Sequence, residues 1–323
     1  MPAARTQPDA ALVLGPRLRH GFSLQSRAVP RRRSIRSRLE RLLGLAERWL
    51  EERLGEPPAP ELFVAHAAFR WEADGARGRL TPLLAPAPFD LDELVGVERP
   101  LAELLRNTEQ FLRGLPAQHV LLYGERGTGK SSAVRGLLTR FAARGLRIVE
   151  VRKSDLLQLP RILVALRGAP FRFLLFCDDL SFDEGEPGHR ELKATLEGGL
   201  ELPPENVRIL ATSNRRHLVP EKRSENRAVR VDEDGELHVG EALEEKLSLS
   251  DRFGLVLGFF GFDQPTYLAI VERHARRAGV RLDASQLRDE ALRWALDRAS
   301  RSGRTARQFV DDLAGRIALE ADR

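Results

Sequence analysis

The sequence predicts an α/β protein with a parallel five-stranded sheet, a helical lid after it and a mostly helical region before it. Three observations predict this fold. Short apolar runs alternate with helical segments through the middle of the chain, the last sixty or so residues carry only helical periodicity, and a Pro-rich linker lies near residue 88. We therefore expect an N-terminal region at residues 1–88, a central domain at 89–262 and a lid at 263–323.

The N-terminal region contains one helical pattern and one hairpin pattern. Apolar residues recur at helical spacing through residues 35–54, and the Pro-rich segment at 56–58 ends the predicted helix. Residues 63–71 and 79–84 predict two strands joined by a turn at residues 74–75.

The central domain alternates predicted strands and helices. Residues 101–112 and 131–144 predict helices with an apolar face. Short apolar runs predict five strands, at residues 119–123, 147–151, 171–177, 207–212 and 254–259. Such runs are typical of a parallel sheet that is covered on both faces. Residues 229–239 predict a hairpin inserted between the last two strands.

The lid contains three amphipathic patterns, which begin near residues 267, 287 and 306. The third helix is expected to begin at the N-cap residue Thr305, and Ser302 is the alternative cap.

Residues 124–131, Gly-Glu-Arg-Gly-Thr-Gly-Lys-Ser, fit the phosphate-binding pattern G-x-x-x-x-G-K-[ST] completely, between a predicted strand and a predicted helix. Glycines let the backbone N–H groups turn toward phosphates, and the helix N-terminus favours anions. Lys130 is expected to reach the β- and γ-phosphates, and the Ser131 hydroxyl is expected to bind Mg²⁺. The expected nucleotide-binding residues are Gly124, Gly127, Thr128, Gly129, Lys130, Ser131 and Ser132.

A pair of carboxylates ends the most apolar predicted strand, at Asp178 and Asp179. Burying two acids is costly unless they meet a cation or hydrogen-bond donors. We expect Asp178 to hold Mg²⁺, directly or through water, and Asp179 to orient or deprotonate an attacking water. A turn-and-cap role for the pair and the nearby carboxylate Glu184 are the alternatives.

The phosphate-binding loop, the apolar strand ending in two acids and the helical lid together resemble AAA+ ATPases, from about residue 89 to 320. More narrowly, the chain resembles a bacterial family of AAA+ ATP-binding proteins classed as a domain of unknown function. Four stretches carry this resemblance: residues 107–111 (NTEQF), 176–182 (FCDDLSF), 211–218 (ATSNRRHL) and 245–254 (EKLSLSDRFG). The resemblance implies a P-loop AAA+ core with Mg·ATP bound to it.

The resemblance also implies roles for polar residues around this core. Asn214 corresponds to the sensor-1 residue, which contacts the γ-phosphate or the attacking water; a cap on the following turn is the alternative. Arg252 corresponds to the arginine finger that reaches a neighbouring subunit's nucleotide. A surface ion pair with Asp251 is the alternative for this arginine.

Two further assignments concern the lid and the adenine. Arg307, expected in the first turn of the last helix, resembles the sensor-2 arginine, with Arg304 as the fallback; a solvated arginine is the alternative for both. Val97, with Val95, is expected where AAA+ proteins pack the adenine base, and two ordinary core valines are the alternative.

One departure from the family pattern concerns the acid pair. Many AAA+ enzymes have Asp-Glu at this position, and this chain has Asp178-Asp179. Because the Asp179 side chain is one methylene shorter than Glu, its carboxylate is expected to act through a second water. Slower hydrolysis follows from this difference.

The leading functional prediction is an oligomeric AAA+ ATPase, often a hexameric ring in this class, that remodels or loads a macromolecular client, with an unidentified protein as the expected partner and nucleic acid as a possible one. The alternative is a slowly hydrolysing, nucleotide-gated loader acting on DNA-associated partners. Asp179, the net charge of +5 and the arginine cluster at 31–38 motivate it. A small-molecule kinase is disfavoured by the lid. Residues 1–88 and 229–239 are where client specificity is expected.

The composition also constrains the location. No apolar run approaches the roughly 20 residues of a membrane span. The chain has a single cysteine, Cys177, so an intrachain disulfide and a cysteine zinc cluster are both excluded. A cytoplasmic location is expected, with Cys177 as a buried core thiol.

Overall fold

The computed structural model describes residues 39–45, 58–75, 77–182, 186–198, 202–216, 218, 230–231, 237–238 and 249–321. The chain divides into two compact units, Met1–Arg48 and Trp49–Arg323. In the first unit residues 39–45 are helical, which agrees with the predicted helix at 35–54; the rest of that prediction lies outside the described residues.

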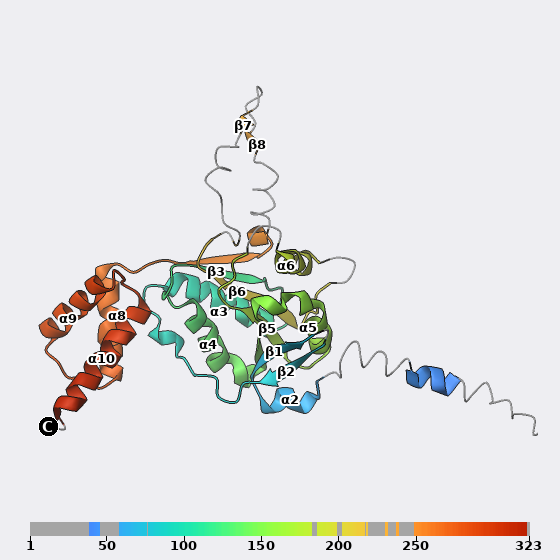
Figure 1. Ribbon diagram of the computed structural model, residues 1–323, viewed down its shortest axis with the longest axis horizontal. Helices are drawn as coiled ribbons and strands as arrows, with labels where there is room; N and C mark the ends of the chain where they lie inside the picture. The colour runs from blue at the N-terminus through green and yellow to red at the C-terminus, as the bar shows by residue number, and fades with distance from the viewer. Residues whose placement is uncertain are drawn as a thin grey trace, which may run out of the picture. The chain divides into compact units, whose positions relative to one another are not determined.

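The second unit is built on one seven-stranded sheet with the order β2-β1-β4-β5-β6-β3-β9. Figure 1 labels β1, β2, β3, β5 and β6 of this sheet. Every neighbouring pair is parallel except the β1–β2 hairpin. The strands are β1 (Ala68–Asp74), β2 (Arg77–Pro82), β3 (Val120–Gly124), β4 (Leu146–Glu150), β5 (Arg172–Cys177), β6 (Val207–Ser213) and β9 (Leu255–Phe259). The predicted α/β class with a parallel sheet is confirmed. The predicted count of five strands is wrong, because the N-terminal hairpin adds two strands to the edge at β4.

The bounds of this hairpin differ from the predicted ones. Its first strand begins at Ala68 rather than at residue 63, because Phe63 lies in the short helix α2 (Pro60–Ala65). The Phe63 ring packs edge-on against Phe69 of β1 and Phe173 of β5, with centroids 5.4 and 5.0 Å apart. Residues 68–82 therefore belong to the central sheet, while the domain limits at 88 and 262 stay a prediction.

Helices cover both faces of the sheet. One face carries α3 (Glu98–Leu112) and α4 (Lys130–Phe141), and the other carries α5 (Leu159–Leu166) and α6 (Pro187–Glu197). Successive residues of β3 serve opposite faces: Leu121 belongs to the core on the α5–α6 side and Leu122 to the core on the α3–α4 side. This double burial is why the strands read as continuous apolar runs.

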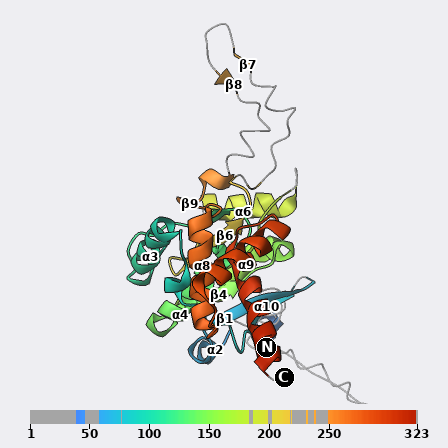
Figure 2. The same ribbon diagram turned by 90° about the vertical axis from the view of Figure 1, so that its left-hand side faces the viewer.

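The lid consists of α8 (Gln264–Arg277), α9 (Ala284–Asp297) and α10 (Gly303–Ala321), which lie together in Figure 2. They enclose their own core, with the buried side chains of Tyr267 and Phe309 within it. The predicted cap Thr305 is wrong. The helix starts at Gly303, and the Ser302 hydroxyl accepts the N–H of Thr305 at 3.1 Å, while the Thr305 hydroxyl bonds to the hydroxyls of Ser302 and Ser300.

The predicted insertion forms a two-stranded antiparallel sheet of β7 (Arg230–Val231) and β8 (Leu237–His238). The hairpin prediction is confirmed in its pairing. Most residues from 219 to 248 lie outside the described part of the chain.

A half-buried histidine links two strands below the sheet edge that carries the phosphate-binding loop. The Nδ1 atom of His119, just before β3, accepts the N–H of Ile209 in β6 at 2.9 Å. Burial, and then the charge of Arg208, lower the pKa of His119 from 6.5 to about 4. The neutral imidazole is therefore the form that the fold requires.

The low pKa of His119 predicts a pH-dependent stability. A depressed histidine pKa means that the unfolded chain takes up a proton first, so this contribution is complete above pH 6.5 and is lost as the pH falls toward 4. We expect it to amount to on the order of 2 kcal/mol of unfolding free energy. Urea titrations across this range should show the loss in the wild type and a shallower pH dependence in His119→Gln. Identical pH profiles for the two proteins would contradict the assignment.

Candidate nucleotide-binding site

The phosphate-binding loop joins β3 to α4 through glycines with positive φ. The φ angles of Gly124, Gly127 and Gly129 are 132°, 77° and 102°. A Cβ atom at Gly124 would overlap the carbonyl oxygen of Phe259 in β9, so no other residue fits there. Gly129 is the N-cap of α4, and no side chain caps this helix. The N–H groups of its first turn are therefore free of a side-chain acceptor, an arrangement that suits a bound anion.

The ammonium group of Lys130 lies inside this loop. It donates hydrogen bonds to the carbonyl oxygens of Gly124 and Glu125, both at 2.7 Å, and its Nζ is 3.4 Å from Oδ1 of Asn214. Lys130 is only 7% exposed. Burial lowers its pKa, and the nearby carboxylates of Asp179 and Asp178 offset part of that effect. The buried ammonium group of Lys130 therefore lies at the sheet edge where Asp178 and Asp179 follow β5.

The first acid is bonded directly to the loop. The Ser131 hydroxyl donates to Oδ1 of Asp178 at 2.8 Å, and the Thr212 hydroxyl donates to the same oxygen at 2.6 Å. Thr212 also accepts the backbone N–H of Asp179 at 2.8 Å and is 1% exposed. One buried hydroxyl therefore fixes both acids relative to the end of β6. Sequence reasoning missed Thr212, because its role depends on β6 lying beside β5.

The second acid is held by the predicted sensor. The side-chain amide of Asn214 donates a hydrogen bond to Oδ1 of Asp179. The backbone of Asp179 has φ of 50°, a left-handed conformation that Asp tolerates better than most residues. The following residue, Leu180, donates its N–H to the carbonyl of Thr212 at 2.7 Å. Strained backbone of this kind is often found at functional sites.

The remaining residues of the predicted loop have local roles. The Thr128 hydroxyl donates to the Glu125 carbonyl at 2.8 Å and is buried, so it stiffens the loop. The Ser132 hydroxyl, at the start of α4, accepts a hydrogen bond from Arg135 at 3.0 Å. A nucleotide contact for these two residues stays a prediction.

The predicted adenine segment lies where the core meets the lid. Val97 is 2% exposed and packs in the core beneath α3 and α4, whereas Val95 packs against the lid core. A Cβ atom at Gly96 between them would lie 2.7 Å from Cγ2 of Thr266 in α8. The close approach of Gly96 to α8 places this segment between the α/β core and the lid. Its contact with an adenine base stays a prediction.

The lid touches the phosphate-binding loop directly. The N–H of Gly303, the first residue of α10, donates to the carbonyl of Gly127 at 2.9 Å. A Cβ atom at Gly127 would lie 3.3 Å from Cβ of Arg304. The charge of Arg304 is also among those that lower the pKa of Lys130. The start of α10 therefore brings Arg304, the fallback residue, beside the loop.

Arg307 lies elsewhere on the same helix. It is the fifth residue of α10, not a residue of its first turn, because the helix begins at Gly303. Its exposed side chain pairs with Asp311 at 3.7 Å. The expectation of a first-turn position for Arg307 is wrong, and the cause is the cap at Ser302.

Arg252 lies at the opposite end of the sheet from the loop. It precedes β9, whose first residue Leu255 pairs with Val120 and whose last residue Phe259 pairs with Gly124. The strand between them is about 13 Å long, which exceeds the reach of an arginine side chain. The guanidinium instead bonds to Glu197 at the end of α6, with Nε 2.9 Å from Oε1. Arg252 therefore does not belong to the site of its own chain.

The described residues contain no cluster of three or more His, Cys, Asp or Glu side chains able to hold a metal ion. Magnesium, however, is usually held by one or two carboxylates together with substrate phosphates, and Asp178 and Ser131 suit such a site.

Cys177 is fully buried, and burial raises its pKa to about 12, so it is a core thiol. No described helix combines the length and apolar character needed to cross a membrane.

A family model described as "Protein of unknown function (DUF815)" matches residues 64–317. The chain belongs to this family. The matched range contains the phosphate-binding loop, both acids, Asn214 and most of the lid, and the predicted resemblance to a family classed as a domain of unknown function is thereby confirmed. A comparison with curated proteins found no match.

Among solved structures, the chain is similar in fold to RuvB of Thermotoga maritima. The RuvB Holliday junction branch migration motor is 19% identical, with a TM-score of 0.44, and the match covers 69% of this chain and 63% of that chain. Two point mutants of the same protein match at 19% identity with TM-scores of 0.46, over 69% of this chain and 64% or 63% of theirs. The chain thus spans less than two thirds of the length of these structures, and the likeness concerns the fold.

Proposed function

We propose that the chain is an AAA+ ATPase that binds Mg·ATP at residues 124–131 and hydrolyses it, as an oligomer, to remodel or load a protein client. The observation that carries this proposal is the hydrogen bond of 2.8 Å from the Ser131 hydroxyl to Asp178. It joins the phosphate-binding loop to the acid pair, so that two oxygen ligands suited to Mg²⁺ meet beside the buried ammonium of Lys130.

The residues present fit a nucleoside triphosphate with its metal. Lys130 supplies three N–H donors and a positive charge, and the uncapped start of α4 supplies backbone N–H groups. Ser131 and Asp178 supply the hard oxygen ligands that Mg²⁺ prefers. When bound, the ion would neutralise charge on the β- and γ-phosphates.

Hydrolysis needs a base and a group that orients it. Asp179 is the carboxylate that accepts the proton of the attacking water, and Asn214, bonded to it, holds it in position. Thr212 fixes the backbone of Asp179 through the hydrogen bond to its N–H. Because Asp179 is shorter than glutamate, we expect turnover to be slow.

Two arginines complete the proposed machinery. Arg304, beside Gly127, is suited to contact the γ-phosphate from the lid and to couple lid closure to the nucleotide. Arg307 is the alternative from the sequence, and its ion pair with Asp311 makes it the less suitable of the two. Arg252 lies too far from its own loop, so a catalytic role for it requires a second copy of the chain.

Replacing Asp179 tests the hydrolytic part of the proposal. In Asp179→Asn we expect phosphate release to fall by about 10²-fold or more, as for loss of a general base, while Mg·ATP still binds. Asp179→Glu is the matched variant, because it keeps the carboxylate and lengthens it, and it should retain or increase turnover. The measurement is steady-state phosphate release, with nucleotide binding assayed in parallel. Release at the wild-type rate from Asp179→Asn contradicts the role given to this residue.

The same variant addresses the client. An ATP-bound Asp179→Asn protein should retain its partner, so a pull-down in the presence of Mg·ATP is expected to recover it. The second candidate function, a nucleotide-gated loader on DNA-associated partners with slow hydrolysis as a timer, is favoured by the short carboxylate of Asp179. A wild-type turnover that is slow, and is not accelerated by the recovered client, would favour the loader.

A further inference from the structure

A pocket with several charged side chains in its lining lies away from the candidate nucleotide site, between α3 and the end of α4. Its volume is about 270 Å³. The lining residues are Leu105, Arg106, Glu109, Arg140, Phe141 and Arg144. Since α4 starts at Lys130 and the pocket is lined by Arg140 and Phe141 near its end, this pocket is about 15 Å along the helix from the phosphate-binding loop. The two sites are therefore distinct.

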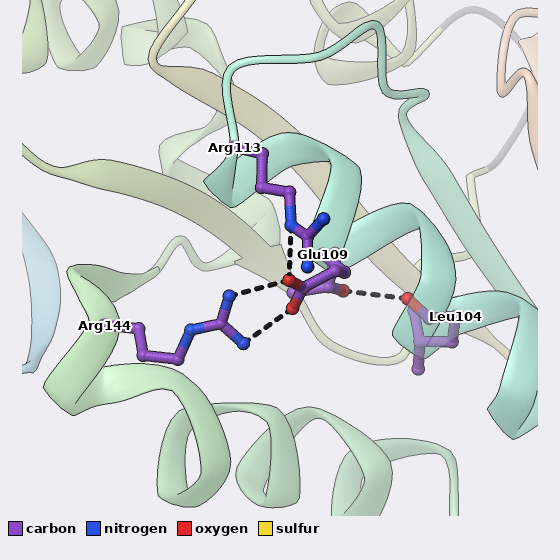
Figure 3. Close-up of polar contacts among 5 residues, drawn as sticks. Leu104, Glu109, Arg113 and Arg144 are labelled. Carbon is purple, nitrogen blue, oxygen red and sulfur yellow. Dashed lines mark hydrogen bonds and ion pairs between the residues drawn. The ribbon is translucent and has the colours of Figure 1, made fainter.

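One carboxylate at this pocket is already paired. Arg144 donates two parallel hydrogen bonds to Glu109, at 2.6 and 2.7 Å, and Arg113 donates a third at 2.7 Å (Figure 3). The bonds from Arg144, and then those from Arg113, lower the pKa of Glu109 to about 2. Glu109 is therefore ionised near neutral pH, and its oxygens are occupied by these two arginines.

The other two arginines of the pocket have no such partner in the part of the chain that the structure describes. Among the described residues, neither Arg106 nor Arg140 has a carboxylate within ion-pair distance, and both side chains are exposed. The guanidinium of Arg140 lies 5.9 Å from the ring centroid of Phe141. The lining thus holds three arginines against one carboxylate. Like charges brought together in this way favour an anionic ligand.

We propose that this pocket binds the phosphate backbone of double-stranded nucleic acid, with Arg106 and Arg140 contacting phosphate oxygens. Guanidinium groups match phosphate oxygens through paired N–H donors. An open pocket suits a backbone that passes across the surface. A single strand would need an exposed aromatic ring for base stacking, and the Phe141 ring in this pocket is only 4% exposed.

The test is the salt dependence of duplex binding, measured by fluorescence anisotropy with a short labelled DNA duplex and without nucleotide. Each phosphate contact contributes about 0.9 to the slope of log affinity against log salt concentration. The double variant Arg106→Ala/Arg140→Ala should therefore lower the magnitude of this slope by about 1.8. The slope identifies these two contacts even where other basic segments also bind the duplex.

Charge-matched controls separate the pocket from the net charge. Arg190 of α6 and Arg288 of α9 are exposed and lie on other elements, so Arg190→Ala/Arg288→Ala removes the same charge and should leave the slope unchanged. Arg106→Lys/Arg140→Lys keeps both charges and should retain most of the slope, which guards against misfolding of the alanine variant.

The proposal is overturned by any of three results: no duplex binding by the wild type at low salt, the same slope in Arg106→Ala/Arg140→Ala as in the wild type, or an equal loss in the control pair. Binding of polyglutamate that depends equally on Arg106 and Arg140 would assign the pocket to acidic protein partners and would also overturn it. Because no nucleotide is present, these results are independent of whether the chain hydrolyses ATP.

Discussion

Replacement of Arg252 by alanine is expected to lower ATP turnover by about 10³-fold or more while leaving nucleotide binding intact, because an arginine finger stabilises charge on the γ-phosphoryl oxygens only in the transition state. The structure gives this expectation a specific form. Arg252 lies before β9, at the end of the sheet opposite to the phosphate-binding loop, and pairs with Glu197 of its own chain. It can therefore serve only the site of another copy.

Mixing two inactive variants tests action between subunits. Arg252→Ala has an intact phosphate-binding loop, and Lys130→Ala has an intact Arg252. If Arg252 acts on a neighbour, a mixture of the two should recover part of the wild-type phosphate release. Glu197→Gln is the control, since it frees Arg252 from its ion pair without removing it and should remain active. Wild-type turnover by Arg252→Ala, or a mixture as inactive as its parts, contradicts the assignment.

Lys130→Ala is expected to weaken Mg·ATP binding about 100-fold, because loss of charge-assisted hydrogen bonds to phosphates costs about 3 kcal/mol. Lys130 is buried against the carbonyls of Gly124 and Glu125, and burial lowers its pKa. Its removal takes away a costly buried charge but also two hydrogen bonds, so the loss of affinity is compared with any change in stability of the nucleotide-free protein. A fluorescent-ATP titration measures the affinity, and a urea titration checks that the fold is intact.

The matched control is Lys193→Ala on α6, which removes the same charge from another element of the chain and should bind ATP like the wild type. An unchanged affinity in Lys130→Ala would exclude the phosphate-binding role of the loop. An equal loss in both variants would show that overall charge, not position, determines binding.

Features encoded within a short stretch of sequence were predictable. The loop at 124–131 requires glycine where φ is positive, so its spacing reports its backbone directly. The five core strands were predicted because burial on both faces leaves continuous apolar runs. The acids Asp178 and Asp179 were recognised for the same reason, as charges at the end of such a run.

Features that depend on contacts between distant segments were not predictable. The pairing of β1 with β4 joins residues eighty positions apart in the chain, and nothing local in the hairpin marks its neighbour. Thr212 acquires its role only because β6 lies beside β5, where its hydroxyl meets Asp178. Ser302 and Thr305 are both suitable caps in sequence, and the bonding among their hydroxyls decides between them. Because Ser302 is the cap, Arg304 rather than Arg307 lies beside the phosphate-binding loop.

The central claim is that the loop and the acid pair form one site for ATP and its metal. Calorimetric titration of the wild-type chain with ATP, with and without Mg²⁺, tests it most directly. Because the Ser131 hydroxyl and the Asp178 carboxylate meet at 2.8 Å, beside Lys130, we predict one site per chain whose affinity rises when Mg²⁺ is present. Binding that is absent under both conditions, or that is the same with and without Mg²⁺, would contradict the claim.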